Sequence, residues 1–245
     1  MAGIDSYTKL MLHCDGDDSA SNHNMTFHGD PILSTSQKKF GSSSLLLDGT
    51  DDYLSASDHA DFDFGANDFT VETWARWGTT PSGNQLIAAH YDYGSSDGSW
   101  YFRATATGFR AGFSDDRTAD DGHYVALDWT YSIVADTWYH LALVRSGNNV
   151  ILFINGVLQS SQAMSLTLFN STAELTIGCF LNSGTPASLL DARIDEIKMS
   201  TAAQWTANFT PETSAYSVAT PPHLKSRYIY PVDKIPPAIG LVKKE

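Results

Sequence analysis

Carboxylate side chains gather in short clusters along this chain, and carboxylate oxygens are the ligands that Ca²⁺ prefers. The clusters are Asp15-Gly-Asp-Asp18, Asp51-Asp52, Asp58 with Asp61 and Asp63, Asp115-Asp116, and Asp120-Asp121. None of them has the spacing of an EF-hand loop. Because Ca²⁺ takes about six to eight oxygens, a single cluster is more often a turn cap or a surface charge. The pattern indicates a capacity to bind cations without fixing a site.

Aromatic residues beside polar ones form a second candidate site, since a sugar ring stacks on an aromatic platform. The segment His90 to Trp100 is the richest of these and supplies the candidate ligand-binding residues Tyr91, Asp92, Tyr93 and Trp100. The segment from 120 to 124 ranks second and adds His123 and Tyr124. An ordinary β-loop whose aromatic rings tuck into the edge of the fold explains the same residues.

Residues for nucleophilic or metal-assisted catalysis are present but not in recognisable arrangements. No Ser/His/Asp or Cys/His motif is found, and no pair of histidines has zinc-ligand spacing. His140 lies within an apolar strand-like run and is predicted to be a satisfied core residue. Cys14 and Cys179 also lie in strand-like runs. They are either buried free thiols or, if their strands are adjacent, a disulfide.

The net charge of −13 is unevenly distributed. From residue 220 onward, five basic and two acidic residues give +3, which leaves −16 for the rest of the chain. A body this acidic repels phosphate backbones, so nucleic acid is not an expected partner. No stretch approaches the ~20 apolar residues of a membrane span. The N-terminus lacks the pattern of a standard secretory signal, so we expect synthesis in the cytoplasm or export by another route.

Strand patterns dominate the chain, so β-strands and the loops between them must position the candidate residues named above. The run at 69–77 mixes β-branched and aromatic residues with polar ones, as strands do. The runs at 138–145 and 150–156 are apolar at both odd and even positions, which is typical of strands covered on both faces. These two runs are joined by a Ser-Gly-Asn-Asn turn and predict a hairpin. The best helical candidate is a turn or two at 202–208. Many short strands separated by Gly, Asn, Asp and Ser predict a sandwich or barrel; the further strand predictions are 44–48, 53–56, 85–90, 100–105, 124–129, 174–178 and 192–200.

Three stretches in order carry a family resemblance: 39–74, 138–156, and 176–211 with its Ala192-Arg-Ile-Asp-Glu-Ile-Lys-Met core. Over roughly residues 7–213 the chain resembles the laminin-G-like, concanavalin A-like lectin/glucanase jelly roll found in tailed-phage structural proteins and bacterial surface proteins. The resemblance implies an all-β, two-sheet antiparallel jelly-roll sandwich. Trp74 and Trp138 are large apolar residues suited to the core between its sheets.

The resemblance also implies where catalysis or a metal would be found. Related glucanases carry Glu-x-Asp-x-x-Glu on one strand, with the carboxylates on one face. The nearest segment here is 191–196, where Asp191 and Asp195 share a face, Arg193 lies between them and Glu196 points the other way. We therefore expect no enzymatic activity. Family members often hold a Ca²⁺ where the first and last strands meet, which suggests Asp15 and Asp195 as ligands with Asp17 as a third.

After about residue 213 the sequence becomes rich in proline and loses its strand-and-turn regularity, which favours an extended chain. We expect a sandwich domain at 1–213 and an extended arm at 214–245. The arm is too apolar for a flexible tail, so we expect it to dock on a second copy or on another structural protein. A fold-back over its own sandwich is the alternative. The candidate docking residues are Tyr228, Ile229, Tyr230, Val232, Ile235, Ile239 and Leu241.

Two functions fit these observations. The first is a non-catalytic virion component, in the capsid or tail, assembled in the host cytoplasm, with a lectin-like domain that docks through its arm and forms homo-oligomers. The second is a free carbohydrate-binding module that recognises surface polysaccharide outside the cell or at its surface. Neither involves membrane insertion.

Overall fold

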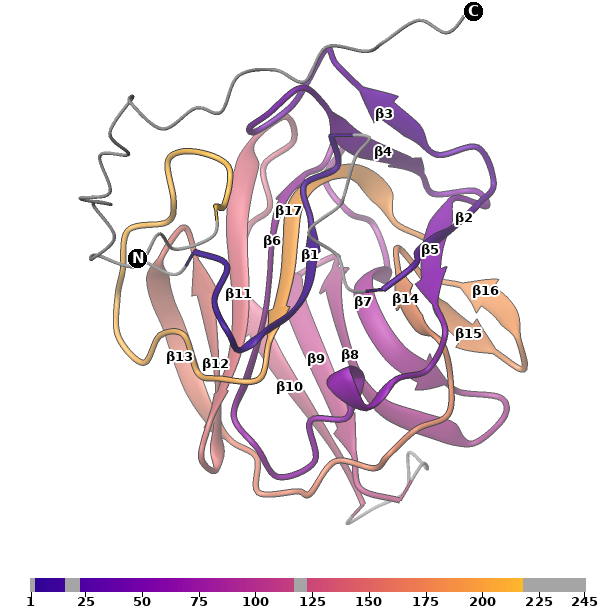
Figure 1. Cartoon of the computed structure of the whole chain (residues 1–245), viewed down its shortest axis with the longest axis vertical. Helices are drawn as coiled ribbons and strands as arrows, with labels where there is room; N and C mark the ends of the chain where they lie inside the picture. Colours follow the sequence, from indigo (N-terminus) through magenta and orange to yellow (C-terminus); the bar gives the residue numbers. More distant parts are fainter. Residues whose placement is uncertain (1–2, 16–22, 117–122, 218–245) are drawn as a thin grey trace, which may run out of the picture.

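The computed structural model describes residues 3–15, 23–116 and 123–217. These residues form an all-β sandwich of two antiparallel sheets, the jelly roll predicted from the sequence (Figure 1). Between the described strands every pairing is antiparallel except one parallel contact of β15 with β7. No helix within these ranges is long and apolar enough to cross a membrane.

The first sheet has the order β13-β12-β11-β6-β17-β4-β3, and β1 also pairs with β17. Its strands are β1 (Thr8–Leu12), β3 (Ile32–Ser34), β4 (Ser44–Asp48), β6 (Phe69–Arg76), β11 (Trp138–Ser146), β12 (Asn149–Ile154), β13 (Val157–Ala163) and β17 (Asp191–Ser200).

The second sheet has the order β10-β9-β8-β7-β14-β5-β2, and a small hairpin of β15 and β16 is attached to β7. Its strands are β2 (Thr26–His28), β5 (Tyr53–Ala56), β7 (Gln85–Asp92), β8 (Asp97–Thr105), β9 (Gly108–Ser114), β10 (Tyr124–Thr130), β14 (Leu175–Ile177), β15 (Phe180–Asn182) and β16 (Thr185–Ala187). A short 3₁₀ helix, η1 (Ala60–Phe62), follows β5.

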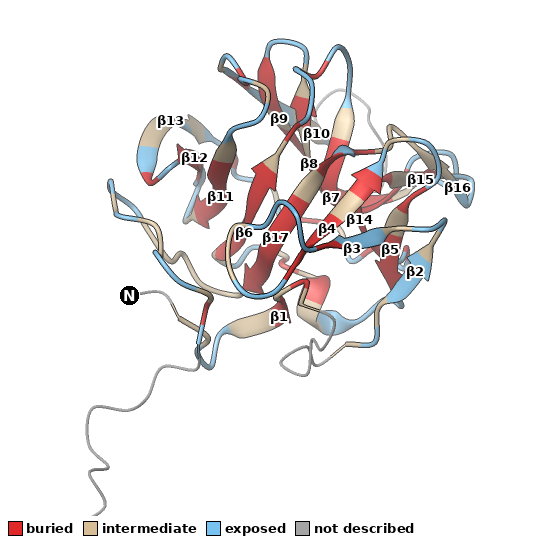
Figure 2. Ribbon diagram, turned by 90° about the horizontal axis from the view of Figure 1, so that it is seen from above, coloured by how far each residue is buried: buried red, intermediate tan, exposed pale blue. Residues whose placement is uncertain are grey.

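The main core lies between the two sheets and is made by alternate residues of their strands (Figure 2). Its tryptophans are Trp77, Trp100 and Trp129. The prediction that Trp74 and Trp138 fill this core is wrong. Trp74 lies on the outer side of β6, against Phe40 and His140, and Trp138 at the start of β11 is only half-buried.

A second, smaller apolar layer covers the outer face of β11 and β12. Trp205 and Phe209 stack with their ring centroids 3.9 Å apart and pack on Ala142, Val144, Ile151 and Phe153. This layer explains why β11 and β12 are apolar at both odd and even positions, as predicted. The predicted helix at 202–208 is wrong, because the segment runs as an irregular cover that follows the sheet.

The covering segment extends beyond the domain boundary drawn at 213. Tyr216 is buried on the first sheet, and the amide of Ile4 donates to the carbonyl of Ser217 at 3.0 Å. Residues 214–217 therefore belong to the sandwich. The arm residues Tyr228, Ile229, Tyr230, Val232, Ile235, Ile239 and Leu241 lie outside the described residues.

Candidate functional site

A cavity of about 230 Å³ opens on the outer face of the second sheet. Three strands contribute its walls: β7, β8 and β10. Phe180 of the β15–β16 hairpin and Tyr93 of the β7–β8 turn complete it. The lining residues are Leu86, Tyr91, Tyr93, Tyr101, Arg103, Tyr124 and Phe180.

Two glycines on neighbouring strands make room for the rings of Tyr91 and Tyr101. Tyr91 pairs in register with Gly98, and Tyr101 pairs with Gly112. A Cβ on Gly98 would lie 2.2 Å from the Tyr91 ring, and a Cβ on Gly112 would lie 2.3 Å from the Tyr101 ring. Each ring therefore lies flat over the glycine opposite it, which is a recurrent way of covering a strand glycine.

The phenol groups of Tyr91 and Tyr124 stay protonated at physiological pH. Burial, followed by the neighbouring Tyr101 and Tyr93, raises the pKa of Tyr91 to about 12. Burial and the adjacent Tyr101 also raise the pKa of Tyr124 well above its ordinary value. The hydroxyls of Tyr101 and Tyr124 are hydrogen-bonded to each other at 2.5 Å, across the intervening strand β9. The cavity thus offers neutral hydroxyls beside aromatic faces.

Of the described residues that line the cavity, Arg103 is the charged one. Its guanidinium lies 5.0 Å from the centre of the Tyr101 ring, and its Nε is buried without a hydrogen-bond partner. Arg110, opposite it on β9, is instead held by Asp128 through bonds of 2.6 and 2.8 Å. No carboxylate among the described residues pairs with Arg103, so its charge is available to a ligand.

Residues 48–205 match the family Laminin_G_3, described as the concanavalin A-like lectin/glucanases superfamily, over more than half of the chain. The chain belongs to this superfamily. A search among curated proteins found no match.

Several solved structures share the fold. The binding domain of botulinum neurotoxin DC in complex with SialylT has a TM-score of 0.62 at 13% identity, with 82% of this chain and 49% of that chain covered. The binding domain of Paraclostridial mosquitocidal protein 1 has a TM-score of 0.62 at 14% identity, with coverage of 83% and 48%. A botulinum neurotoxin type C structure, described as dependent on two ganglioside molecules for cell entry, has a TM-score of 0.61 at 13% identity, with coverage of 81% and 49%.

These identities establish a common fold alone, and this chain spans about half the length of each of those proteins. The lectin-like domain therefore resembles binding domains of toxins in its architecture. The chemistry of its own cavity has to come from its own residues.

The structure separates the residues predicted for ligand binding in this lectin-like domain into two groups. Tyr91, Tyr93 and Tyr124 line the cavity, although they come from segments 30 residues apart in the chain. Asp92, Trp100 and His123 do not line it. Sequence reasoning missed the other lining residues: Leu86, Tyr101, Arg103 and Phe180. The alternation of β8 was the available clue, because Tyr101 and Arg103 lie between its core residues.

The three excluded residues have other roles. Asp92 holds the β15–β16 hairpin, since its carboxylate accepts bonds from the amides of Ser183 at 2.6 Å and Gly184 at 3.0 Å. Trp100 is fully buried in the main core, where its Nε1 donates to the carbonyl of Phe62. His123 is exposed, and its Nδ1 lies 2.9 Å from Oδ1 of Asp115.

The acidic residues of β17 do not form a glucanase-like cleft in this superfamily member. A bulge between Asp195 and Lys198, with a φ of 51° at Glu196, breaks the alternation of the strand. The prediction that Glu196 points away from Asp195 is therefore wrong, because both carboxylates lie on the outer side of the sheet. Glu196 is fully buried and accepts from the amide of Tyr216 at 2.9 Å.

Asp15 and Asp195, the residues suggested as calcium ligands, hold successive parts of one loop. Oδ1 of Asp15 accepts from the amides of Ser42 and Ser43 at 2.6 and 2.9 Å. Oδ2 of Asp195 accepts from the amides of Lys39 and Phe40 at 2.8 and 3.1 Å, and its buried Oδ1 has no partner. Burial, outweighing these amide bonds, raises the pKa of Asp195 to about 7. Asp17 lies outside the described residues, so the calcium site stays a prediction.

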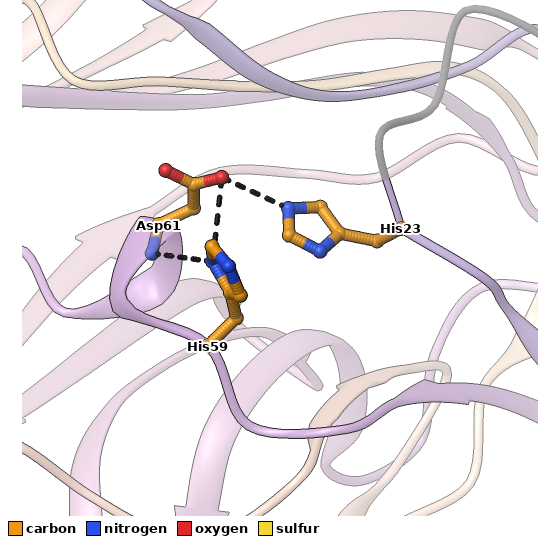
Figure 3. Close-up of side chains that lie close together, drawn as sticks. All are labelled: His23, His59 and Asp61. Carbon is orange, nitrogen blue, oxygen red and sulfur yellow. Dashed lines mark hydrogen bonds and ion pairs between the residues drawn. The ribbon is translucent and has the colours of Figure 1, made fainter.

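Histidines meet carboxylates where the sequence spacing did not suggest it. His23 and His59 both point at Asp61, with Nε2 of His23 at 3.1 Å and Nδ1 of His59 at 3.4 Å from Oδ2 (Figure 3). His140 is buried, as predicted, but it is only half satisfied: its Nε2 lies 3.1 Å from Oε2 of Glu72, and its Nδ1 has no hydrogen-bond partner. Cys14 and Cys179 are both buried and are not bonded to each other, so the disulfide alternative is not realised.

Proposed function

We propose that this lectin-like domain is a non-catalytic carbohydrate-binding module that holds a glycan in the tyrosine-lined cavity of its second sheet. The observation that carries the proposal is the lining itself: four tyrosines, Phe180 and one arginine without an ion-pair partner. Sugars present apolar ring faces and a rim of hydroxyls, and this cavity offers aromatic faces with neutral phenol hydroxyls beside them.

Arg103 favours an acidic sugar over a neutral one. A guanidinium binds a carboxylate through paired hydrogen bonds, and a ligand carboxylate would give the buried Nε of Arg103 the acceptor that it lacks. The fold relatives described in complex with SialylT or with gangliosides support this direction, because both descriptions name sialylated or glycolipid ligands.

The size of the cavity favours the end of a glycan chain. Its volume of about 230 Å³ lies below the roughly 300–1,000 Å³ of pockets for drug-sized ligands. One sugar ring fits such a space, and the next ring would extend over Tyr93, whose side chain is 59% exposed and lies near the Tyr91 ring. We therefore expect recognition of a terminal acidic sugar.

Binding without hydrolysis follows from the same lining. Glycoside hydrolysis uses a pair of carboxylic acids that flank the scissile bond. Among the described residues no carboxylate lines the cavity, and Asp195 and Glu196 of β17 are engaged under other segments of the chain. The described lining thus offers the aromatic platform of a lectin without the paired carboxylic acids of a glucanase.

A glycan titration of the full chain tests the proposal. We expect sialyllactose or an oligogalacturonate to bind and to quench tyrosine fluorescence, with lactose at least tenfold weaker. Arg103→Gln should weaken the acidic ligand by tenfold or more, about 1.4 kcal/mol or above. Tyr93→Ala should weaken it less, because Tyr93 contacts only the second ring.

Arg110→Gln is the matched control. It removes the same charge from the neighbouring strand, but Arg110 is paired with Asp128 and does not line the cavity. Equal losses from the Arg103 and Arg110 variants would show general electrostatic attraction and contradict a built site. Absence of binding to every acidic and neutral glycan on an array would contradict the whole proposal.

The toxin binding domains among the fold relatives favour this module over the virion component considered from the sequence. The virion assignment rested in part on the arm predicted at 214–245, of which residues 218–245 lie outside the described residues. Location in the virion, at the cell surface or outside the cell stays a prediction from sequence alone.

A further inference from the structure

A second cluster of ionisable groups lies where the loop after β5 meets the end of β7. Asp58 belongs to that loop, Asp63 follows η1, and His90 is on β7. One ligand atom from each of the three residues lies within 4.8 Å of the other two. The cluster is separate from the glycan cavity, because His90 and Tyr91 are consecutive strand residues and only Tyr91 lines the cavity.

His90 is fully buried, and neither of its ring nitrogens makes a well-aligned hydrogen bond, although Asp58 and the backbone of Ala173 lie close enough to raise its pKa. Nε2 lies 3.3 Å from Oδ1 of Asp58, and Nδ1 lies 3.9 Å from Oδ1 of Asp63. Burial lowers the pKa of His90, although Asp58 opposes this, so the imidazole is neutral at physiological pH. A buried polar ring without well-aligned hydrogen bonds is costly, and a neutral imidazole nitrogen is a metal ligand.

The carboxylates around this ring repel one another. Burial, and then the neighbouring Asp58, raises the pKa of Asp63 to about 6. Asp97 also acts on His90 through its charge. Within the described part of the chain, the neutral donor that reaches the Asp63 carboxylate is the side-chain amide of Asn170, whose nitrogen lies 3.0 Å from both carboxylate oxygens when turned toward them. A cation placed among these groups would remove the repulsion.

We propose that Asp58, Asp63 and His90 bind a divalent transition-metal ion of the Zn²⁺ class. One imidazole with two carboxylates is a mixed nitrogen and oxygen set, which suits Zn²⁺ or Mn²⁺ and not Ca²⁺ or Mg²⁺, whose ligands are oxygens. Bonds of about 2.0–2.2 Å to a tetrahedral Zn²⁺ place neighbouring ligand atoms roughly 3.3–3.5 Å apart. The 3.3 Å between Oδ1 of Asp58 and Nε2 of His90 already has this value. The 3.9 Å contact of Asp63 is to the other ring nitrogen, Nδ1, so Asp63 would have to turn toward Asp58 to share one ion with it.

A metal ion can reach the site from solvent, and the site has room for a further ligand. The side chain of Asp58 is 35% exposed, so an ion reaches the cluster from solvent at that residue. Asn170 can present either its nitrogen or its oxygen to the cluster, because the two ends of an amide have the same shape. Its nitrogen donates to the Asp63 carboxylate when turned toward it. Its oxygen, or a water, would complete the coordination of a bound ion.

The neighbouring cluster of His23, His59 and Asp61 is the natural competitor, and it is already neutralised within the protein (Figure 3). Oδ1 of Asp61 is paired with Lys9 at 3.3 Å, so a cation there would be repelled by the ammonium. Nδ1 of His59 accepts from the amide of Asp61 at 3.1 Å, which occupies the single lone pair of that nitrogen. This cluster therefore serves as an internal control.

The test uses the full chain, freed of metal with a chelator and titrated with ZnCl₂. We expect one Zn²⁺ to bind per chain, a rise in melting temperature of several degrees, and no comparable effect of CaCl₂ or MgCl₂. Asp58→Asn and Asp63→Asn should each weaken Zn²⁺ binding at least tenfold. Asp61→Asn, which makes the same change in the control cluster, should leave binding unchanged.

Imidazole ¹⁵N chemical shifts identify the histidine that coordinates the ion without a variant at the buried His90. The proposal expects a coordination shift at His90 and none at His23 or His59. It is overturned if the shifts appear only at His23, His59 or the exposed His123. It is also overturned if Asp61→Asn abolishes binding while Asp58→Asn does not, or if Zn²⁺ changes neither the melting temperature nor any imidazole shift.

Discussion

The hydroxyl of Tyr216 donates a 2.7 Å hydrogen bond to Oε2 of Glu72, a fully buried carboxylate on β6. The same carboxylate faces the imidazole of His140 at 3.1 Å and the ammonium of Lys198 at 2.7 Å. A charged cluster thus lies under the outer layer of the first sheet, and the segment after β17 closes over it. This cluster fixes the end of the sandwich.

Removing one hydroxyl should loosen that closure. We expect Tyr216→Phe to lower the free energy of unfolding by about 2 kcal/mol, because the bond to a buried charged acceptor is lost while the ring still packs. Urea denaturation measures the change. Tyr93→Phe, an exposed tyrosine with no such bond, is the control and should change the free energy of unfolding by less than about 0.5 kcal/mol.

The stability of the sandwich should fall in acid through Glu72. Burial alone would raise the pKa of Glu72, but the hydrogen bond from His140 and the charge of Lys198 outweigh it and lower the pKa. A carboxyl whose pKa is lower in the folded state stabilises the protein above its unfolded value near 4.5, and this contribution disappears as the pH falls through the folded value.

Glu72→Gln tests this assignment. At pH 7 we expect the variant to be less stable by about 3–5 kcal/mol, because the buried ammonium of Lys198 loses its carboxylate partner. The difference between wild type and variant should shrink as the pH is lowered toward 3. A difference that is constant from pH 7 to 3 would show that ionised Glu72 contributes nothing.

The predicted calcium site at Asp15 and Asp195 gives a clear outcome in either direction. If Ca²⁺ binds, it should raise the melting temperature of chelator-treated protein by mass action, and Asp195→Asn should abolish the rise. If it does not, Asp195→Asn should equal or exceed the wild type in stability, since Oδ1 of Asp195 is buried without a partner. Melting curves with Ca²⁺ and with chelator distinguish the two.

Gly112 should be required for the cavity more than for the fold. In Gly112→Ala the new methyl group meets the Tyr101 ring at 2.3 Å and the Tyr124 hydroxyl at 2.7 Å, so both side chains must move. We expect loss of glycan binding with a stability cost of about 1–2 kcal/mol. Gly83→Ala is the matched control, because nothing lies within 4 Å of its added Cβ. Intact binding in Gly112→Ala would contradict the placement of the ligand on these two rings.

Two truncations separate the sandwich from the arm. Ending the chain after residue 213 removes Tyr216 and the bond between Ile4 and Ser217, so we expect a lower melting temperature. Ending it after residue 217 keeps these contacts and should leave the melting temperature unchanged. If the arm docks on a second copy, as the sequence suggested, the chain that ends after residue 217 should lose self-association. Light scattering measures this loss.

The amino-acid sequence by itself determined the class of fold. Apolar residues at both parities of 138–145 and 150–156 indicated strands covered on both faces, and the structure provides both covers. Such patterns are local, because burial of a strand face is recorded in every second residue. The strand at 108–114 was missed, because Gly108 and Gly112 lower its strand propensity. The ring of Tyr101 on the neighbouring strand covers Gly112, which the local sequence does not reveal.

The candidate sites were decided by tertiary structure. Tyr91 and Tyr124 were singled out from sequence, yet the register of β8 and β9 determined that Tyr101 and Arg103 would join them. The bulge at Glu196 reversed the expected direction of one carboxylate, and the loop after β5 carried Asp58 and Asp63 to His90. Register, bulges and loop paths depend on partners far away in the chain, so the order of residues along one strand does not contain them.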